Sequence, residues 1–414
     1  AIDRGDPNSR SLGEPRPNGN RIDLGAYGNT SQANTSADPM VQILGPNGLE
    51  KIEVGVPVTV SWRSAGLLPY DSVLRLNAGQ NNNADVNNWL GQQTGERTDG
   101  YTNYYGSIAA ATAIDMSALP AGTPEAMVRS YAYAPGGTNA GYQITYQLGA
   151  PDGAYQAVLY FVEPSNIAVG ARKFDIVANG TVIATDVDVR ALAGNTINKA
   201  VALTLNVNVT GAQGLKLEFV NKSASYSAIV SGIELRRANA NGVANPVLSL
   251  QASTDNGASW ATVATGLTLD PYGNGQTLWT PDTETVGNTA RLRVVATINP
   301  VGGPITVSDV SDEGFLIANA GNRYYVNDGS LAGDEYTTAV GDNANSGKDA
   351  SRPMASLAAL LRAYDLDAGD IIYVDSGSYS LATNIVLGAQ DSGVVIQGAQ
   401  QPGHATVLDR GNTN

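Results

Sequence analysis

The stretch AVALTLNVNV at residues 200–209 decides the fold class, because apolar and polar side chains alternate along most of it. A period of two residues is typical of a β-strand that buries one face. Comparable runs, bounded by turn-forming residues, occur at 72–77, 142–148, 155–162, 173–178, 214–220 and 228–235. This set of strands predicts that residues 70–237 form a β-sandwich of their own.

The strand patterns on both sides of this unit are incomplete. Residues 39–69 contain a short strand at 41–44 and the strictly alternating VPVTVSW at 56–62, which are too few for a stable unit. Residues 238–320 contain further strands and a hairpin turn, at 247–252, 255–257, 277–281 and 290–296. We therefore predict that 39–69 and 238–320 fold together as one immunoglobulin-like sandwich, into which 70–237 is inserted.

Residues 321–414 have shorter strand patterns, separated by Gly-rich corners, at 370–374, 383–387, 393–398 and 405–408. Between them and the preceding sandwich, Leu357, Leu360, Leu361 and Tyr364 recur at helical spacing, and Ser351 is expected to cap this helix. Short strands at even spacing indicate a parallel β-helix solenoid. We predict the start of such a solenoid, preceded by one short helix.

Residues 1–38 are too short for a domain and are predicted to hold one strand, at 21–27. Ile22, Leu24 and Ala26 would share one face of this strand. A lone strand cannot bury its apolar face, so this segment is expected to pack on another part of the protein.

The predicted insertion resembles the malectin-type carbohydrate-binding modules. The resemblance rests on LRLNAG at 74–79, GAYQAVLYFVE at 153–163 and RKFDI at 172–176, which occur in the order found in that family. It implies a β-sandwich whose loops bind glycans through aromatic residues and an acidic residue.

The flanking parts resemble two other families. VTVSW at 58–62 and STDNGASW at 253–260 resemble an immunoglobulin-like domain of bacterial surface proteins. GDIIYV at 369–374 resembles the opening of a right-handed pectate-lyase-like β-helix, and RIDLGAYGNT at 21–30 resembles its closing coil. These resemblances imply a modular bacterial extracellular protein.

Together these patterns predict an all-β chain of two β-sandwiches, one inserted in the other, and a partial right-handed parallel β-helix with one short capping helix. Residues 1–38 would be the closing-coil segment and linker of a β-helix, and 321–414 the start of one. Because the sequence starts at Ala1 rather than Met, we expect a processed chain or a segment of a longer one.

Composition excludes several classes of function. The 414 residues include no cysteine and one histidine, His404, which argues against thiol catalysis and a zinc site. The formal net charge is −14 without a Lys/Arg cluster, so no nucleic-acid partner is expected. No apolar run is long enough for membrane insertion. We expect a secreted or cell-surface protein that is not an enzyme.

Tyrosine marks the candidate glycan site. Of 19 tyrosines, nine lie between residues 101 and 160, several in loop-like stretches of the predicted insertion. Tyrosine rings stack on sugar faces and their hydroxyls bind sugar edges. The residues chosen for this site are Tyr101, Tyr104, Tyr105, Tyr131, Tyr133, Glu163 and Tyr226. The alternative is that these tyrosines pack against neighbouring domains.

Calcium is the one cofactor with candidate ligands in the sequence. The loop before the predicted helix contains four oxygen-bearing side chains, Asp342, Asn343, Asn345 and Asp349. Ala344 and Pro353 stand where an EF-hand needs oxygen ligands, so this is not an EF-hand. A solvated turn is the alternative interpretation.

The β-helix pieces at both ends predict head-to-tail assembly. An unfinished solenoid leaves an open end with unpaired backbone groups, and a closing-coil strand from another copy could cover it. The interface residues would be Ile22, Leu24, Ala26, Val395, Val407 and Leu408. The predicted function is a structural or adhesive building block of an extracellular fibre or surface assembly, with a glycan-binding module. The alternative is the carbohydrate-binding portion of a larger secreted polysaccharide-active protein.

Overall fold

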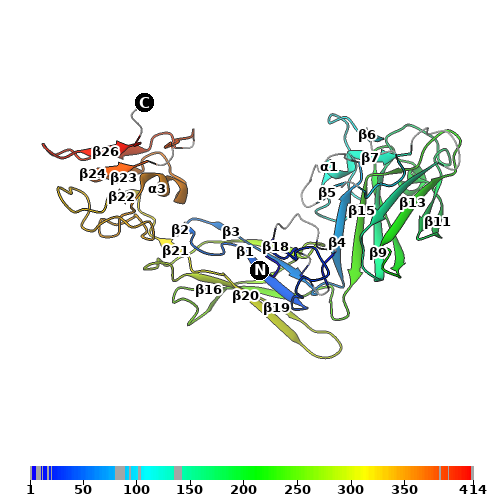
Figure 1. Ribbon diagram of the computed structural model, residues 1–414, viewed down its shortest axis with the longest axis horizontal. Coiled ribbons are helices and arrows are strands. Elements are labelled where there is room, and N and C mark those ends of the chain that lie inside the picture. The colour runs from blue at the N-terminus through cyan, green and yellow to red at the C-terminus, as the bar shows by residue number, and fades with distance from the viewer. Residues whose placement is uncertain are drawn as a thin grey trace.

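The computed structural model describes residues 2–5, 11, 13–15, 18–19, 21–79, 89–92, 95–100, 104–134, 142–381, 384–389 and 391–411. β-Strands dominate them, which confirms the all-β prediction. Their helices are short: α1 (Glu125–Val128), α2 (Val189–Leu192) and α3 (Leu357–Ala363). None of these helices is long enough to cross a membrane. Figure 1 shows three strand-rich parts, with β4 to β15 at one end and β22 to β26 at the other.

The part around β9 contains two facing sheets. One has the order β12 (Ala200–Val209), β9 (Gly153–Val162), β15 (Gly232–Ala238), β4 (Tyr70–Asn77) and β5 (Leu90–Gly91). The other has the order β11 (Thr181–Val187), β10 (Phe174–Ala178), β13 (Leu215–Asn221) and β8 (Gln143–Leu148).

The seven strands predicted between residues 72 and 235 form in this part, because each buries alternate side chains between the sheets. Phe161, Phe174 and Phe219 meet at the centre with ring centroids 5.8–6.4 Å apart. Among the strands of these two sheets, sequence analysis missed β5, which is two residues long, and β11, which is exposed along most of its length and so lacks apolar alternation.

The middle part pairs segments that are far apart in the sequence. One sheet has the order β1 (Met40–Gly45), β3 (Val58–Ala65) and β18 (Asn274–Trp279). The other has the order β17 (Ala261–Leu267), β16 (Val247–Ser253), β19 (Arg291–Ile298) and β20 (Ile305–Val310). In addition, β2 (Lys51–Glu53) runs parallel to β21 (Leu316–Ala318).

A buried tryptophan joins these segments. Trp62 is fully buried and lies opposite Gly275 in the β3–β18 pair. A Cβ atom added at Gly275 would overlap the Trp62 ring, so glycine is required there. The apolar core around Trp62 draws on residues 41–67 and 248–317 together. The division into an inserted and a split domain stays a prediction, and this pairing is the observation that favours it.

The third part consists of parallel strands. β22 (Arg323–Val326), β23 (Ile371–Val374) and β25 (Val395–Gln397) form one sheet, and β24 (Gly377–Ser380) and β26 (Thr406–Asp409) form another. Residues 384–387 form no strand, contrary to prediction, and residue 383 lies outside the described residues. Parallel pairing agrees with a solenoid, while a right-handed β-helix stays a prediction.

The helix in this part is capped by a different serine from the one predicted. Met354 donates its backbone N–H to the Tyr325 carbonyl and pairs with Val326, which keeps the chain extended after Ser351. α3 therefore begins later, where the Ser356 side chain accepts a hydrogen bond from the Ala359 N–H at 3.3 Å.

The strand predicted at residues 21–27 is wrong. The Glu14 carboxylate accepts hydrogen bonds from the backbone N–H groups of Asp23 and Asn29, both at 2.8 Å, and so curls this segment into turns. Carboxylate oxygens thereby take donors that a neighbouring strand would need. As a result Leu24 is 55% exposed instead of facing a core.

Candidate functional site

Three of the predicted tyrosines gather on one face of a small sheet with the order β14 (Ile229–Val230), β7 (Ser130–Tyr133) and β6 (Tyr105–Ser107). Along β7, Ser130 and Ala132 are buried, whereas Tyr131 and Tyr133 point to the other side and are half-buried. Their ring centroids are 6.4 Å apart, and Tyr104 contacts Tyr133 edge-on at 5.6 Å. Tyr104, Tyr131 and Tyr133 are called the tyrosine face below.

A glycine makes room for the Tyr131 ring of this face. Gly106 lies opposite Tyr131 in the β6–β7 pair, and an added Cβ atom would overlap the Tyr131 ring. The ring therefore lies across the backbone of β6. Burial raises the pKa of the Tyr131 hydroxyl, with Arg172 opposing and Glu163 adding to the rise. The hydroxyl stays neutral, able both to donate and to accept hydrogen bonds.

Tyr105 belongs to the opposite side of the sheet. It pairs with the buried Ala132, so its side chain shares the inner face. Its hydroxyl donates to Oε1 of Gln92 at 2.9 Å, and the Arg97 guanidinium lies 5.4 Å from its ring centroid. Tyr105 thus supports the sheet from behind. Tyr101 lies outside the described residues.

A buried arginine that sequence analysis missed holds the tyrosine-bearing segments together. Arg97 donates to the carbonyl oxygens of Tyr104 at 3.1 Å and Tyr133 at 2.8 Å. Its Nε also pairs with the Asp99 carboxylate at 2.9 Å, and both side chains are almost wholly buried. No sequence pattern singled out Arg97, because the backbone carbonyls of Tyr104 and Tyr133 accept its hydrogen bonds, and any residue type supplies a carbonyl.

Glu163 and Tyr226 both contact Arg172, a second arginine that sequence analysis missed. Arg172 donates to both carboxylate oxygens of Glu163, at 2.7 and 3.2 Å, and to the Ser227 carbonyl. Its guanidinium lies 5.5 Å from the Tyr226 ring centroid. Glu163 is fully buried, so it holds Arg172 in place rather than reaching a ligand itself. Arg172 is the first residue of the RKFDI motif at 172–176, and this motif was the sequence feature from which its role could have been inferred.

The predicted calcium ligands already have protein partners. Asp342 accepts from the Ala344 N–H at 2.9 Å, and Asn343 from the Ala355 N–H at 3.1 Å. Asn345 donates to the Pro353 carbonyl at 3.0 Å, and Asp349 pairs with Arg352. Across the described part of the chain, no three His, Cys, Asp or Glu side chains are grouped to hold a metal. Calcium binding stays a prediction.

The predicted assembly residues lie at the surface or near it. Ala26 is exposed and Ile22 is half-buried. Val395, Val407 and Leu408, on the last strands β25 and β26, are each nearly half exposed.

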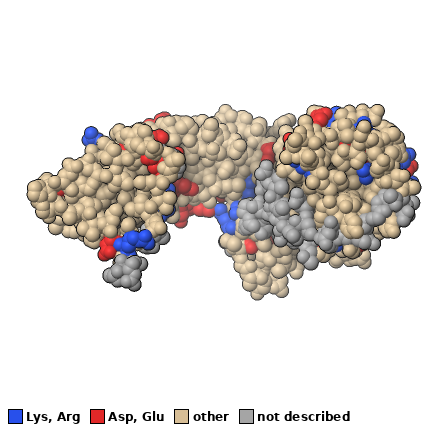
Figure 2. Space-filling model, turned by 90° about the horizontal axis from the view of Figure 1, so that it is seen from above, with Lys and Arg blue, Asp and Glu red and all other residues tan. Residues whose placement is uncertain are grey.

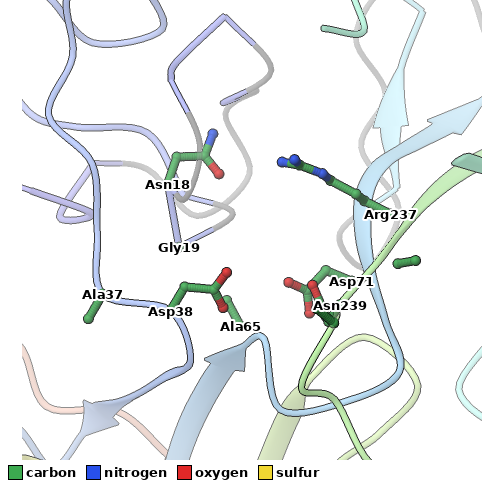
Figure 3. Close-up of a pocket in the computed structure, with 10 residues that line it drawn as sticks. Asn18, Gly19, Ala37, Asp38, Ala65, Asp71, Arg237 and Asn239 are labelled. Carbon is green, nitrogen blue, oxygen red and sulfur yellow. The ribbon is translucent and has the colours of Figure 1, made fainter. Parts of the chain in front are cut away.

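A separate pocket of about 250 Å³ lies between the N-terminal segment and the start of β4. Asp38 and Asp71 face one another across it, and Arg237 points toward Asn18 (Figure 3). The Asp71 carboxylate accepts a hydrogen bond from the Gly66 N–H at 3.0 Å. The tyrosine face adjoins Gly79, beyond the other end of β4, so the two sites are about 25 Å apart along that strand.

Charged side chains are sparse on the molecule. On the face drawn in Figure 2, the described Lys and Arg residues are scattered and form no continuous basic patch. This agrees with the overall net charge of −14. A ligand bound through a polyphosphate backbone would need such a patch.

Comparison with known proteins identifies one domain. Residues 72–234, less than half of the chain, match the family model of the malectin domain and are called the malectin-like domain below. Among solved structures, the ANX2 ectodomain from Arabidopsis thaliana is 13% identical with a TM-score of 0.35, covering 48% of this chain and 56% of that one. The plant receptor-like kinase FER is 18% identical with a TM-score of 0.33 and the same coverage. The chain thus spans little more than half the length of these proteins. No curated protein matches it.

Proposed function

We propose that this chain is an extracellular carbohydrate-binding protein whose malectin-like domain binds glycans at the tyrosine face. The observation that carries the proposal is the gathering of Tyr104, Tyr131 and Tyr133 on one side of β6 and β7. Aromatic rings at an exposed edge offer stacking surfaces, and neutral hydroxyls add hydrogen bonds of both kinds. The family match of residues 72–234 supports this assignment.

Rigidity of the face supports the same proposal. Arg97 ties Tyr104 to β7 through main-chain carbonyls, and the buried Arg172–Glu163 pair fixes the neighbouring strand ends. A site whose side chains are held in place before binding loses less conformational entropy on binding. We propose a binding module and no catalytic role. The lone His404 hydrogen-bonds Glu335 at 3.1 Å.

Replacing Tyr104, Tyr131 and Tyr133 together with Ala should abolish glycan binding. Each lost stacking ring is expected to weaken binding by about 1–3 kcal/mol. The wild-type chain would be screened on a glycan array, and the best-bound oligosaccharide would be titrated by calorimetry. The Tyr105→Phe variant is the matched control, because it removes only the hydrogen bond to Gln92 on the inner face. Unchanged affinity in the triple variant would exclude the tyrosine face.

A second candidate function, self-assembly, is favoured by the last two strands. β25 pairs only with β23, and β26 only with β24, so each has one edge without a partner among the described strands. Val395, Ile396, Val407 and Leu408 are 39–48% exposed on these strands. Unpaired strand edges with apolar side chains recruit further strands. We propose that the N-terminal segment of another copy, with Leu24 and Tyr27 exposed, covers this surface.

Assembly should disappear when lysines replace Val407 and Leu408. Buried lysine charges would oppose any apolar contact, so the double variant should sediment as a monomer at concentrations where the wild type forms larger species. Val301→Lys is the control, because Val301 is fully exposed in a turn of the middle part. A wild type that sediments only as a monomer would refute the proposal.

A further inference from the structure

A groove of about 650 Å³ lies on the middle part of the molecule, between β17 and β18. Two tryptophans, Trp260 and Trp279, line it together with a series of hydroxyl-bearing residues: Ser253, Thr254, Ser259, Thr262, Thr280 and Thr283. Its volume is within the range of small-molecule sites, about 300–1,000 Å³. Asp282 is the one charged residue among the described residues that line it.

Trp260 is positioned by a tight hairpin turn. The Asp255 carboxylate accepts hydrogen bonds from the Ser253 hydroxyl at 2.6 Å and from the Ser259 N–H at 2.9 Å. Hydrogen bonds from Ser253 and Ser259 lower the pKa of Asp255 to about 2, so the carboxylate remains charged at neutral pH. The Arg293 guanidinium lies 4.2 Å from the Trp260 ring centroid. This cation–π contact holds the indole at the groove.

Trp279 is fixed differently, at the end of β18. It contacts the fully buried Phe315 edge-on, with ring centroids 6.1 Å apart. Both groove tryptophans are half-buried, whereas the other two, Trp62 and Trp89, are fully buried. Among the described residues, neither the Trp260 nor the Trp279 indole N–H has a hydrogen-bond acceptor. Each indole therefore offers a ring surface and an available donor.

We infer that this groove is a second carbohydrate site, which takes a linear neutral polysaccharide along Trp260 and Trp279. Indole rings stack on the apolar faces of sugar rings, and serine and threonine hydroxyls pair with sugar hydroxyls. The absence of lysine and arginine among the described lining residues favours an uncharged chain. This site goes beyond the proposed function, since it lies outside the malectin-like domain and shares none of its residues.

An extended peptide is the competing occupant, because β17 and β18 are edge strands of their two sheets. The geometry disfavours it. The pairing of β17 with β16 shifts register twice, between Leu248 and Ser249 and between Leu250 and Gln251. Such irregularities twist an edge and discourage the addition of another strand. A polysaccharide needs no regular ladder of backbone hydrogen bonds.

The tryptophans themselves provide the test. Acrylamide should quench only Trp260 and Trp279 in the folded full-length chain, because Trp62 and Trp89 are fully buried. Cellohexaose, a linear neutral hexasaccharide, should protect the fluorescence from quenching in a saturable manner. Trp260→Ala should weaken its binding by about tenfold or more, as for other aromatic anchors. Val286→Ser is the control, since Val286 is 80% exposed on the same part of the molecule and does not line the groove.

Trp260→Ala is the main variant, because Trp279 contacts core residues and its replacement could unfold the middle part. The Tyr104, Tyr131 and Tyr133 triple variant should retain cellohexaose protection, which separates this site from the tyrosine face. Three outcomes would each overturn the inference: no saturable protection by cellohexaose, equal protection in Trp260→Ala, or protection by an extended Val/Thr peptide but not by the sugar.

Discussion

The Arg172→Met variant should lose about 3–5 kcal/mol of the free energy of unfolding of the malectin-like domain. Glu163 is fully buried and makes its ion pair with Arg172, at 2.7 Å. Among the described residues, removing the guanidinium leaves the buried carboxylate with the Ser165 N–H, at 3.0 Å, as its remaining hydrogen-bond donor. The Ser227 carbonyl and the Tyr226 ring lose their partner as well. Glycan binding should weaken in parallel, because the strand ends beside Tyr131 are no longer held.

Urea unfolding measures the change in the free energy of unfolding. Hydrogen exchange on peptides from β9 and β12 shows where in the domain the stability is lost. Lys222→Met is the matched control: the Lys222 ammonium is exposed, so its ion pairs with Asp175 and Asp186 should contribute far less to stability than the buried Glu163–Arg172 pair. Replacing Glu163 and Arg172 together, with Leu and Met, should restore much of the stability, since no charge stays unpaired. A single variant as stable as the wild type would show that Glu163 is compensated elsewhere.

Residues 245–318 expressed alone should show no cooperative unfolding at all. Among the described strands, their β18 pairs only with β3, and the core they would form lacks Trp62, Ile43, Val60 and Val41. Losing a single large core side chain already costs about 3–5 kcal/mol, which is comparable with the stability of a whole domain. Adding residues 39–69 in trans should restore the transition.

Residues 70–237 alone should melt cooperatively in the same calorimetric experiment. Every residue of the largest apolar core, from Val73 to Leu235, lies inside this fragment. Tyr272, whose ring lies 4.8 Å from the Arg75 guanidinium, is one of the contacts from outside that the fragment loses. A cooperative melt of 245–318 alone would contradict the predicted split, and a non-cooperative 70–237 would contradict the predicted insertion.

Strand prediction succeeded where burial is one-sided. In β12 and β13, alternate side chains enter the core, so the period of two is visible in the sequence. It failed where that signal is missing: β11 and β17 are exposed along most of their length. It also failed at residues 21–27, where the apolar pattern is present but the Glu14 carboxylate takes the Asp23 backbone N–H.

The candidate site, like the strands, was predicted from the sequence only in part. Composition and spacing pointed to Tyr104, Tyr131 and Tyr133, because tyrosines crowd one region of the sequence. Which face each ring occupies depends on strand register, and this places Tyr105 behind the sheet. Sequence alone also missed the arginines behind the face. Arg97 and Arg172 each donate to a backbone carbonyl, of Tyr133 and Ser227 respectively, that lies far from them along the chain.

The amino-acid sequence was therefore sufficient for the all-β class, for most strands and for the malectin resemblance, since all three depend on local patterns of burial and turns. Tertiary structure alone decided which surfaces bring side chains together. Trp260 and Trp279 form one groove because two edge strands from different sheets meet there. Leu24 is exposed because buried carboxylates bend its segment. Contacts between distant segments carry no local periodicity, so only the folded chain reveals them.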